Sequence, residues 1–228
     1  MREVDRVMVD ELGIGLELMM EHAGRQLAVV ARDWVLGGTT VGRRVIVLAG
    51  KGGNGGGALV AARRMSGWGC DVHAILSSSV SELSPVTRAQ LSRSRAAGVQ
   101  ATVGIDGQGW GRADVILDGL VGYSLAGAPN ARAAVLIHAA NQDPAPTVSL
   151  DVPSGLDAST GHVAEPTIRA AITVTLALPK IGLRAPDAAA TVGDIYLADI
   201  GVPGEALIRA GVETTHPIFA DRDLFLIQ

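Results

Sequence analysis

Three polar side chains stand at the ends of short apolar runs, where α/β proteins usually carry their chemistry. Asp118 and Asp151 each close an apolar run, and Asn54 follows the run 45–49 within a glycine-rich stretch. These runs have the length and β-branching of buried parallel strands, and ligands of open α/β sheets bind beyond the carboxyl ends of such strands. One aspartate at a strand end often only caps the next turn. Two of them beside a glycine loop favour a functional crevice.

The glycine-rich stretch Gly50–Gly57 is interrupted only by Lys51 and Asn54, and it leads from a strand pattern into an alanine-rich helical pattern. The free N–H groups at the start of such a helix, together with its dipole, favour the binding of phosphate. Flexible linkers can have the same composition, but a linker is rarely bracketed by a core strand and an apolar helix. A ligand-binding loop is therefore the stronger interpretation.

The loop fits the dinucleotide pattern G-x-G-x-x-G at Gly50, Gly52 and Gly55, but the sequence lacks the rest of that site. A dinucleotide-binding dehydrogenase needs an acidic residue at the end of the second strand to hold a ribose. The second predicted strand instead ends in the serines 77–79, and Asp71 stands at its opposite end. An NAD-dependent oxidoreductase is thus poorly supported. A Walker loop is excluded because no Gly-Lys-Ser/Thr closes the stretch.

Oxygen donors, rather than nitrogen or sulfur donors, gather near the predicted crevice. Asn54, Asp118 and Ser154 offer an amide, a carboxylate and a hydroxyl oxygen, a hard donor set that suits an alkali or alkaline-earth ion. Their single formal negative charge favours a monovalent ion. The five histidines are scattered without ligand spacing, which argues against a transition metal. Ser154 lies in no G-x-S-x-G elbow, which argues against a serine hydrolase.

The composition narrows the class of protein further. The 228 residues suffice for one α/β domain with a substantial core, and no apolar run reaches the ~18 residues of a membrane span. The charged N-terminus does not resemble a signal peptide. A net charge of −4 and an aromatic content of 3% argue against nucleic acid as a partner. The single cysteine, Cys70, excludes an internal disulfide and favours a reducing, cytoplasmic setting. Taken together, these observations predict a cytoplasmic protein that binds neither membrane nor nucleic acid.

Apolar runs alternate with helical patterns along the whole chain, which predicts an α/β fold. We expect a single Rossmann-like domain over 1–228, with a doubly wound, mainly parallel sheet and helices on both faces. In 16–36 the apolar residues recur at helical spacing, and that face is expected to form core or a homodimer contact rather than a site. The predicted strands are 45–49, 71–76, 114–118, 147–151, 171–177 and 194–199, with a weaker one at 99–103, and the predicted helices lie near 55–67, 84–97, 129–142 and 203–211.

Several longer motifs, in order along nearly the whole chain, resemble those of the NAD(P)H-hydrate epimerases, also called YjeF N-terminal domains. The stretch GKGGNGGGALVAARRM is similar to the family's GPGNNGGDGLVAARHL, and SLDVPSGLDASTG nearly matches its DIPSGLDADTG signature. ILDGLVGYSL and LALPKIGL resemble its hVDALFGTGL and FGAPKPGL segments. The opening Glu3 and Asp5 and the closing strand 194–199 follow the family pattern as well.

The resemblance implies an isomerase that repairs nicotinamide nucleotides. Its substrate would be hydrated NADH or NADPH, which carries a hydroxyl on the ring carbon beside the nitrogen. It would interconvert the R and S epimers for a separate or fused dehydratase. No hydride moves, which agrees with the missing ribose-binding acid. The resemblance also implies a potassium ion, K+, held by Asn54, Asp118 and Ser154.

Carried over by position, Asp151 is the expected acid/base residue and Lys180 the second choice, although Lys180 could instead be a solvated loop lysine. Gly53 and Gly57 replace an asparagine and an aspartate of the family pattern, and Tyr123 replaces the threonine of its G-T-G. A catalytically silent YjeF-like protein that binds a nucleotide or acts as a scaffold is therefore the competing hypothesis. The expected substrate-binding residues are Gly53, Asn54, Gly55, Gly56, Gly57, Gly122, Tyr123, Ser124, Leu125, Ala126, Gly127, Ala128 and Asp151.

Overall fold

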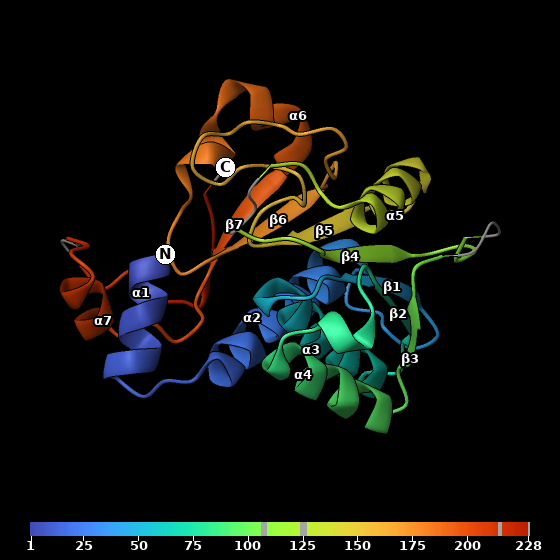
Figure 1. Cartoon of the computed structure of the whole chain (residues 1–228), viewed down its shortest axis with the longest axis horizontal. Coiled ribbons are helices and arrows are strands. Elements are labelled where there is room, and N and C mark those ends of the chain that lie inside the picture. The colour runs from blue at the N-terminus through green and yellow to red at the C-terminus, as the bar shows by residue number, and fades with distance from the viewer. Residues whose placement is uncertain (106–108, 124–126, 214–215, 228) are drawn as a thin grey trace.

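A computed structural model describes residues 1–105, 109–123, 127–213 and 216–227 of the chain. Its strands are β1 (Arg44–Ala49), β2 (Asp71–Leu76), β3 (Gln100–Val103), β4 (Val115–Gly119), β5 (Thr147–Leu150), β6 (Ile172–Leu176), β7 (Asp194–Ala198) and β8 (Leu224–Leu226). Within the described residues they form one sheet in the order β3-β2-β1-β4-β5-β6-β7-β8. Neighbouring strands run parallel except for β7 and β8, which pair antiparallel at one edge. The sheet is therefore doubly wound and mainly parallel, as the sequence predicts (Figure 1).

The helices alternate with the strands along the chain, and none of those described is long and apolar enough to cross a bilayer. They are α1 (Arg2–Arg6), α2 (Leu16–Val30), α3 (Gly53–Gly67), α4 (Pro85–Ala96), α5 (Ala131–Gln142), α6 (Ala189–Val192) and α7 (Gly204–Arg209). Shorter helical turns are η1 (Val7–Glu11), η2 (Ala31–Val35), η3 (Val80–Glu82), η4 (Ile181–Arg184) and η5 (Pro186–Ala188).

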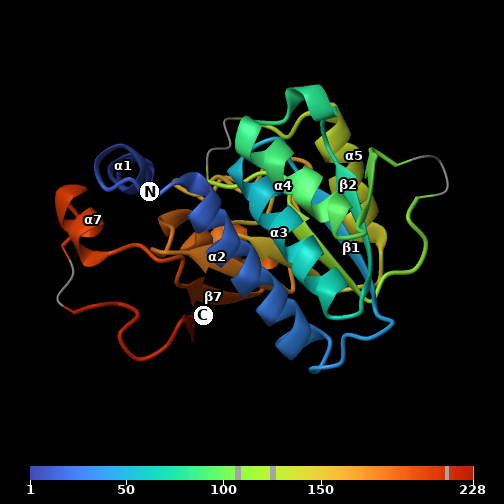
Figure 2. The ribbon, with the colours of Figure 1, turned by 90° about the horizontal axis from the view of Figure 1, so that it is seen from below.

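The helices cover both faces of the sheet. α2, α3 and α4 pack side by side on one face, and α5 lies on the other (Figure 1 and Figure 2). In β1, Val45 and Val47 belong to the core that includes α3, whereas Ile46 and Leu48 belong to the core that includes α5. Because alternate residues of a strand face opposite sides, a strand that is apolar throughout is buried on both faces. The continuous apolar run 45–49 thus explains why β1 lies inside the sheet, between β2 and β4.

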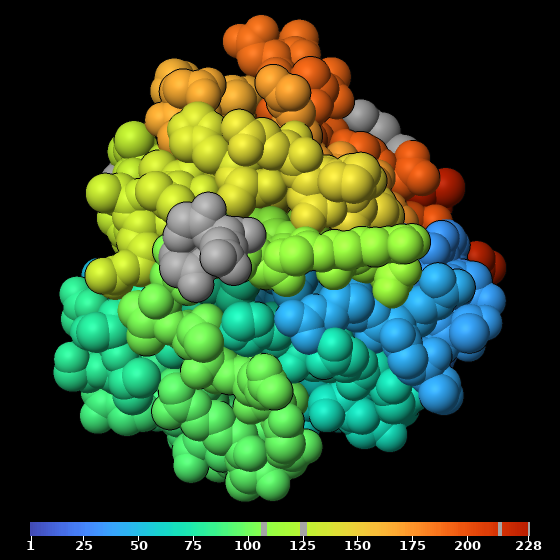
Figure 3. Space-filling model, turned by 90° about the vertical axis from the view of Figure 1, so that its right-hand side faces the viewer, coloured from blue at the N-terminus to red at the C-terminus, as the bar shows by residue number. Residues whose placement is uncertain are grey.

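The sheet changes its winding direction between β1 and β4. In the side view of Figure 3, residues 109–114 (light green) pass between α5 (yellow) and the segment before β1 (blue). This segment brings the chain from β3, at the edge of the sheet, back to its middle. There β4 pairs with β1 rather than with β3. A crevice forms at the carboxyl ends of two strands where the order reverses.

Glycines allow the loops at this crevice to approach one another closely. A Cβ at Gly50 would lie 1.8 Å from the carbonyl oxygen of Leu120, and one at Gly119 would lie 2.4 Å from the Cβ of Ala58. The N–H of Gly50 donates to the carbonyl oxygen of Gly119 at 3.0 Å. A side chain at Gly50 would therefore force apart the loops that follow β1 and β4, and one at Gly119 would push α3 away from β4.

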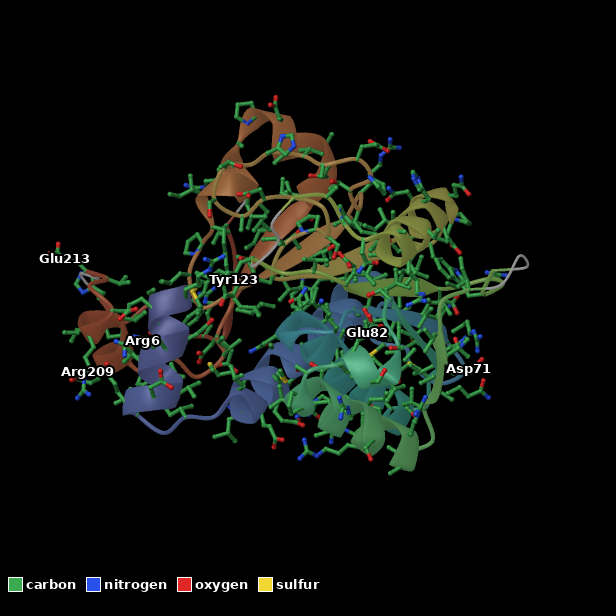
Figure 4. The ribbon with its side chains drawn as sticks, in the orientation of Figure 1. Arg6, Asp71, Glu82, Tyr123, Arg209 and Glu213 are labelled. Atoms are coloured by element: carbon green, nitrogen blue, oxygen red, sulfur yellow. The ribbon has the colours of Figure 1, made fainter. Side chains whose placement is uncertain are left out.

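The N-terminal helix packs against a helix from near the C-terminus, beside the sheet. α1 and α7 lie side by side (Figure 1 and Figure 2), and Glu11 accepts hydrogen bonds from Arg6 at 2.8 Å and from Arg209 at 3.4 Å. Figure 4 shows both arginines on this side of the molecule. Val7 and Met8 are buried in the main core, so apolar packing as well as surface charge anchors this N-terminal segment.

The sequence-based elements agree closely with the structure. Each predicted strand ends within one residue of an observed one, and each predicted helix within two, with η2 completing the helical run 16–36. The predictions missed α1, α6 and β8, which are only 5, 4 and 3 residues long. Segments this short do not complete enough periods for their hydrophobic pattern to be recognised.

Candidate functional site

A cavity of about 630 Å³ opens at the carboxyl ends of β1, β4 and β5. Its walls come from the loop between β1 and α3, the loop after β4, the residue after β5, and the N-terminal helices α1 and α2. The position is the one that the strand order of a doubly wound sheet predicts for a ligand. Asn54, Tyr123 and Asp151 line it together with Lys51.

The start of α3 forms one wall of the cavity. The helix begins at Gly53, so its first N–H groups have no partners inside the helix, and Gly53 and Asn54 line the cavity. The Nδ2 atom of Asn54 donates to the carbonyl oxygen of Leu150 at 3.0 Å, which ties this turn to the end of β5. The side-chain oxygen of Asn54 lies 3.1 Å from the position that a Cβ on Gly122 would take. The wall therefore combines backbone donors with one amide side chain.

Asp151 lies at the centre of the site, directly after β5, with its carboxylate bound on both sides. Its Oδ2 accepts a hydrogen bond from the backbone N–H of Tyr123 at 3.0 Å. Its Oδ1 forms an ion pair with the Nζ of Lys180 at 2.5 Å, and Lys180 also donates to the carbonyl oxygen of Leu176 at 2.7 Å. Both charged side chains are buried, at 4% and 6% exposure. Lys180 is therefore not a solvated loop lysine but the counter-charge of Asp151.

The backbone of Asp151 adopts φ = 70°, in the left-handed region that residues other than glycine rarely occupy. Its N–H donates to the carbonyl oxygen of Val174 on β6 at 2.8 Å, which holds the turn in place. Such a conformation costs of order 1–3 kcal/mol and persists where the surroundings enforce it, often at functional sites. Here it turns the carboxylate toward the cavity.

Tyr123 joins the site to the N-terminal helix. Its hydroxyl donates a hydrogen bond to Asp5 of α1, and Figure 4 shows Tyr123 between α1 and the sheet. Burial raises the pKa of Asp5, although the hydrogen bond from Tyr123 opposes this shift. Burial also raises the pKa of Tyr123, and the neighbouring Asp5 reinforces that change. The phenol therefore remains a hydrogen-bond donor at neutral pH.

Asp118 and Ser154 are in direct contact beneath the loop that follows β4. The Ser154 hydroxyl donates to Oδ1 of Asp118 at 2.6 Å, and the Ser154 N–H donates to Oδ2 at 2.9 Å. Ser149 and the N–H of Leu120 supply two further hydrogen bonds, at 2.8 and 3.1 Å. Asp118 is completely buried, and this burial raises its pKa. Among the described residues its hydrogen-bond donors are all neutral, so the charge of an ionised Asp118 has no direct counter-charge there.

The structure thus divides the expected site residues into three sets. Those that line the cavity are Gly53, Asn54, Gly122, Tyr123, Ala128 and Asp151. Gly55, Gly56 and Gly57 are buried inside the packing of α3 and do not line it, and Gly127 is exposed outside it. Ser124, Leu125 and Ala126 lie outside the described residues.

Sequence reasoning missed the contribution of the N-terminus to the site. Asp5 of α1 and Met19 and Met20 of α2 line the cavity. The helical pattern of 16–36 predicts only core or a dimer contact for its apolar face, but the methionines of that face are buried core residues that also form the cavity wall. The Glu3/Asp5 pattern is the one signal in the sequence that could have identified Asp5. Its target, Tyr123, is 118 positions away.

No group of three or more His, Cys, Asp or Glu side chains suited to a metal exists in the described part of the chain. The expected potassium set is of a different kind, because two of its three members are neutral oxygen donors. Asp118 and Ser154 of that set are in contact, and Asn54 lines the cavity nearby.

Comparison with known proteins shows what this architecture is similar to. The family model described as "YjeF-related protein N-terminus" matches residues 16–182. A protein of Dehalogenimonas lykanthroporepellens named NAD(P)H-hydrate epimerase is 43% identical over 93% of this chain and 84% of its own length. A protein of the same name from Rhodopirellula baltica is 32% identical over 92% of this chain and 86% of its own length.

Two further matches are a longer relative and a solved structure. A protein of Salinibacter ruber named bifunctional NAD(P)H-hydrate repair enzyme Nnr is 35% identical over 92% of this chain, which spans 41% of that protein's length. The crystal structure of yeast ynu0 superposes with a TM-score of 0.78, covering 99% of this chain and 96% of the yeast chain at 24% identity. The fold is therefore shared in full with a solved structure. Together the family model and the relatives show that the chain belongs to the family of YjeF-related N-terminal domains that includes proteins named NAD(P)H-hydrate epimerase.

Proposed function

We propose that this protein is an NAD(P)H-hydrate epimerase, an isomerase that interconverts the R and S forms of hydrated NADH or NADPH. The observation that carries the proposal is the buried Asp151–Lys180 pair, whose carboxylate lines the cavity at the switch point of the sheet. Relatives that align over most of their own length bear this name. They lend no support to the competing hypothesis of a silent scaffold.

The reaction needs a group that can both give and take a proton beside the hydrated ring carbon. In the proposed reaction the Asp151–Lys180 pair gives a proton to the ring hydroxyl. The C–O bond breaks, water leaves, and the lone pair of the ring nitrogen forms a C=N bond. Water then adds to the other face of the ring, its proton returns to the pair, and the C=N bond becomes a C–N bond again. Asp151 is the member that lines the cavity, so it is the group placed to contact the ring.

The remaining contacts of the substrate are proposed to be mainly with the backbone. Gly53 carries no side chain, and the start of α3 presents free N–H groups to the cavity. Such amides bind phosphate oxygens without help from side chains. Gly53, Asn54, Gly122 and Tyr123 are thus proposed to bind the nucleotide, with Lys51 as a nearby cation.

We also propose that the protein binds K+ through Asn54, Asp118 and Ser154. The residues fit such an ion: Asp118 is a buried carboxylate with only neutral hydrogen-bond donors in the described chain, and Ser154 contacts it directly. Hard oxygen donors of low total charge suit a monovalent cation. When bound, the ion would offset the buried charge and stiffen the loop after β4.

The bifunctional relatives indicate the partner reaction. Because this chain aligns with about two fifths of their length, we propose that a dehydratase, separate or fused, consumes one of the epimers that this protein interconverts.

We further propose a single domain over 1–228, which one sheet spanning β1 to β8 supports, and a reducing, cytoplasmic setting, which the single cysteine supports. We also propose that the protein forms a homodimer, and light scattering of the purified protein would test this.

The test is the interconversion of one purified epimer of hydrated NADH and of hydrated NADPH. We expect the protein to speed the appearance of the other epimer, followed by chromatography, well above the spontaneous rate measured with heat-denatured protein. Binding of the nucleotide without any acceleration would overturn the proposal and favour a silent binding protein. Comparison of the two substrates also decides which nucleotide is preferred.

A further inference from the structure

Tyr123 makes two contacts that connect distant parts of the site. Its backbone N–H donates to Oδ2 of Asp151 at 3.0 Å, and its side-chain hydroxyl donates to Asp5 of α1. One residue therefore links the N-terminal helix to the carboxylate proposed to move the proton. Both Asp5 and Tyr123 line the cavity and are half-buried, so the linkage lies at the site itself and not on the outer surface.

The identity of the side chain makes this linkage possible. Where the family pattern G-T-G has a threonine, this chain has Tyr123, whose hydroxyl extends much farther from the backbone. Gly122 before it is buried between neighbours: a Cβ there would lie 3.1 Å from the side chain of Asn54 and 3.2 Å from Oδ2 of Asp151. The turn is therefore tightly packed. The donor to Asp151 is the backbone N–H of Tyr123 itself, so a small shift of Tyr123 would also move this hydrogen bond.

The hydrogen bond between Asp5 and Tyr123 is not what docks α1 onto the protein. Val4, Val7 and Met8 already bury that segment in the main core, and Glu11 pairs with Arg209 of α7. Removal of one polar contact from a helix anchored in this way should leave it in place. The hydrogen bond between Asp5 and Tyr123 therefore serves to fix the loop after β4, which contains Tyr123, rather than to hold α1.

We infer that Asp5 and Tyr123 are positioning residues of the catalytic site: Asp5 holds the Tyr123 side chain, and the Tyr123 N–H thereby holds Asp151 in its productive orientation. This inference rests on the proposed role of Asp151. Lys180 fixes one carboxylate oxygen and the Tyr123 N–H the other, so loss of the Asp5 contact loosens the residue that holds one side of the carboxylate. Misplacement by about 1 Å can cost as much as 10²-fold in rate.

Four variants and a control test the inference. Asp5→Ala and Tyr123→Phe both remove the hydrogen bond, and each should lower kcat about 10- to 100-fold while KM changes little. Asp5→Asn keeps a hydrogen-bond acceptor and should retain most of the activity. The double variant Asp5→Ala/Tyr123→Phe should be no slower than the slower single variant, because both changes break one interaction. Glu3→Gln, an equal loss of charge on the exposed side of α1, should behave as the parent.

The alternatives predict different results. If Asp5→Asn is as slow as Asp5→Ala, the charge or proton of Asp5 is required and the positioning role is wrong. If all variants retain the parent kcat and only melt at lower temperature, the contact is merely structural. Additive losses in the double variant would also contradict a shared interaction.

A second measurement keeps the inference separate from the proposed activity. Hydrogen–deuterium exchange of the Tyr123 amide should speed up about fivefold in Asp5→Ala and stay unchanged in Glu3→Gln, because the lost contact is worth about 1 kcal/mol. This readout needs no turnover. An unchanged exchange rate in Asp5→Ala would overturn the positioning role even in an active epimerase, whereas faster exchange in an inactive protein would count only against the proposed function.

Discussion

At the scale of single residues, the site is organised around one carboxylate. Asp151 lies in a left-handed backbone conformation, is almost completely buried, and has a separate partner for each oxygen. A buried charge of this kind is stable only when it is paired and hydrogen-bonded. Lys180 and the N–H of Tyr123 meet that requirement, and they also fix the direction in which the carboxylate faces the cavity.

Asp151→Asn tests the chemistry most directly. The substitution keeps the size of the side chain but removes the proposed proton acceptor, so kcat should fall about 10²–10⁴-fold with a modest change in KM. The measurement is the initial rate of epimer interconversion, corrected for the spontaneous reaction. Parent-like turnover in a folded Asp151→Asn protein would remove Asp151 from the acid/base role and transfer the role to Lys180.

Lys180→Met tests the ion pair as a stability element. The change leaves the Asp151 carboxylate buried without its counter-charge, which should lower the free energy of unfolding by about 3–5 kcal/mol. Addition of Asp151→Asn to this variant removes the orphaned charge and should restore part of that loss. Urea denaturation of the parent, the single variant and the double variant measures both effects, and equal stability of the two variants would show that the unpaired carboxylate is not what destabilises Lys180→Met.

At the scale of elements, α3 shows that its glycines serve different purposes. Gly53 is exposed at the cavity, and a Cβ there would meet only the Met20 methyl group at 3.7 Å. Gly55 is buried, and a Cβ there would lie 1.9 Å from the carbonyl oxygen of Gly50. Gly53 therefore leaves the cavity open, and Gly55 allows the helix to pack against the loop before it.

The pair Gly53→Ala and Gly55→Ala measures this difference. Gly53→Ala should stabilise the protein by about 0.5–1 kcal/mol, because alanine loses less conformational entropy in a helix. Gly55→Ala should destabilise it by about 3 kcal/mol, because a backbone atom must move. Thermal and urea unfolding of both variants provide the comparison. Similar stabilities would mean that the loop between β1 and α3 adapts more readily than the packing indicates.

Asp157 provides a pH-dependent prediction in the turn that follows the SLDVPSGLD segment. Its carboxylate accepts hydrogen bonds from the N–H groups of Ser159 and Thr160, both at 2.8 Å, and these bonds lower its pKa below the ordinary 3.8. A group with a lowered folded-state pKa stabilises the protein above its unfolded pKa, and this contribution is lost as the pH falls through the folded value. Asp157→Ala should therefore melt about 2 °C below the parent at pH 7.

The difference between parent and Asp157→Ala should shrink as the pH is lowered from 3.8 toward the folded pKa and disappear below it. Scanning calorimetry of both proteins across this range measures the effect. A melting difference that stays constant to the lowest accessible pH would show that the turn is stabilised by something other than the ionised carboxylate.

At the scale of the whole molecule, the sheet order brings the two halves of the chain to one crevice. β1 lies between β2 and β4, so the glycine loop of the first half faces the polar strand ends of the second. Asp118 lies beneath this junction, completely buried. An ion bound there would connect loops from both halves, so its effect should appear in the cooperative unfolding of the protein.

K+ should therefore raise the melting temperature more than Na+ or Li+ at equal ionic strength. At ten times its dissociation constant, a bound ion adds about 1.4 kcal/mol, which corresponds to several degrees for a protein of this size. Ser154→Ala removes one proposed ligand and should abolish the difference between ions, whereas Ser159→Ala, in an exposed turn, should preserve it. An equal response of the parent to all three salts would contradict a potassium site.

Much of the fold follows from the amino-acid sequence by itself. Hydrophobic periodicity predicts the strands and longer helices, because a buried strand and an amphipathic helix need only local patterns to be recognised. The glycine loop and the carboxylates at the strand ends indicate the crevice, because parallel strands place their carboxyl ends at one edge. The direct contact of Asp118 with Ser154 agrees with their expected proximity.

Only the tertiary structure decided which of these residues reach the cavity. Gly55, Gly56 and Gly57 turn inward, since a helix has a buried face as well as a free N-terminus. Lys180 is buried against Asp151, although in the sequence it could equally be a solvated loop residue. The contact between Asp5 and Tyr123 spans 118 positions. Such contacts depend on strand order and on the path of the loops, which local sequence patterns do not encode.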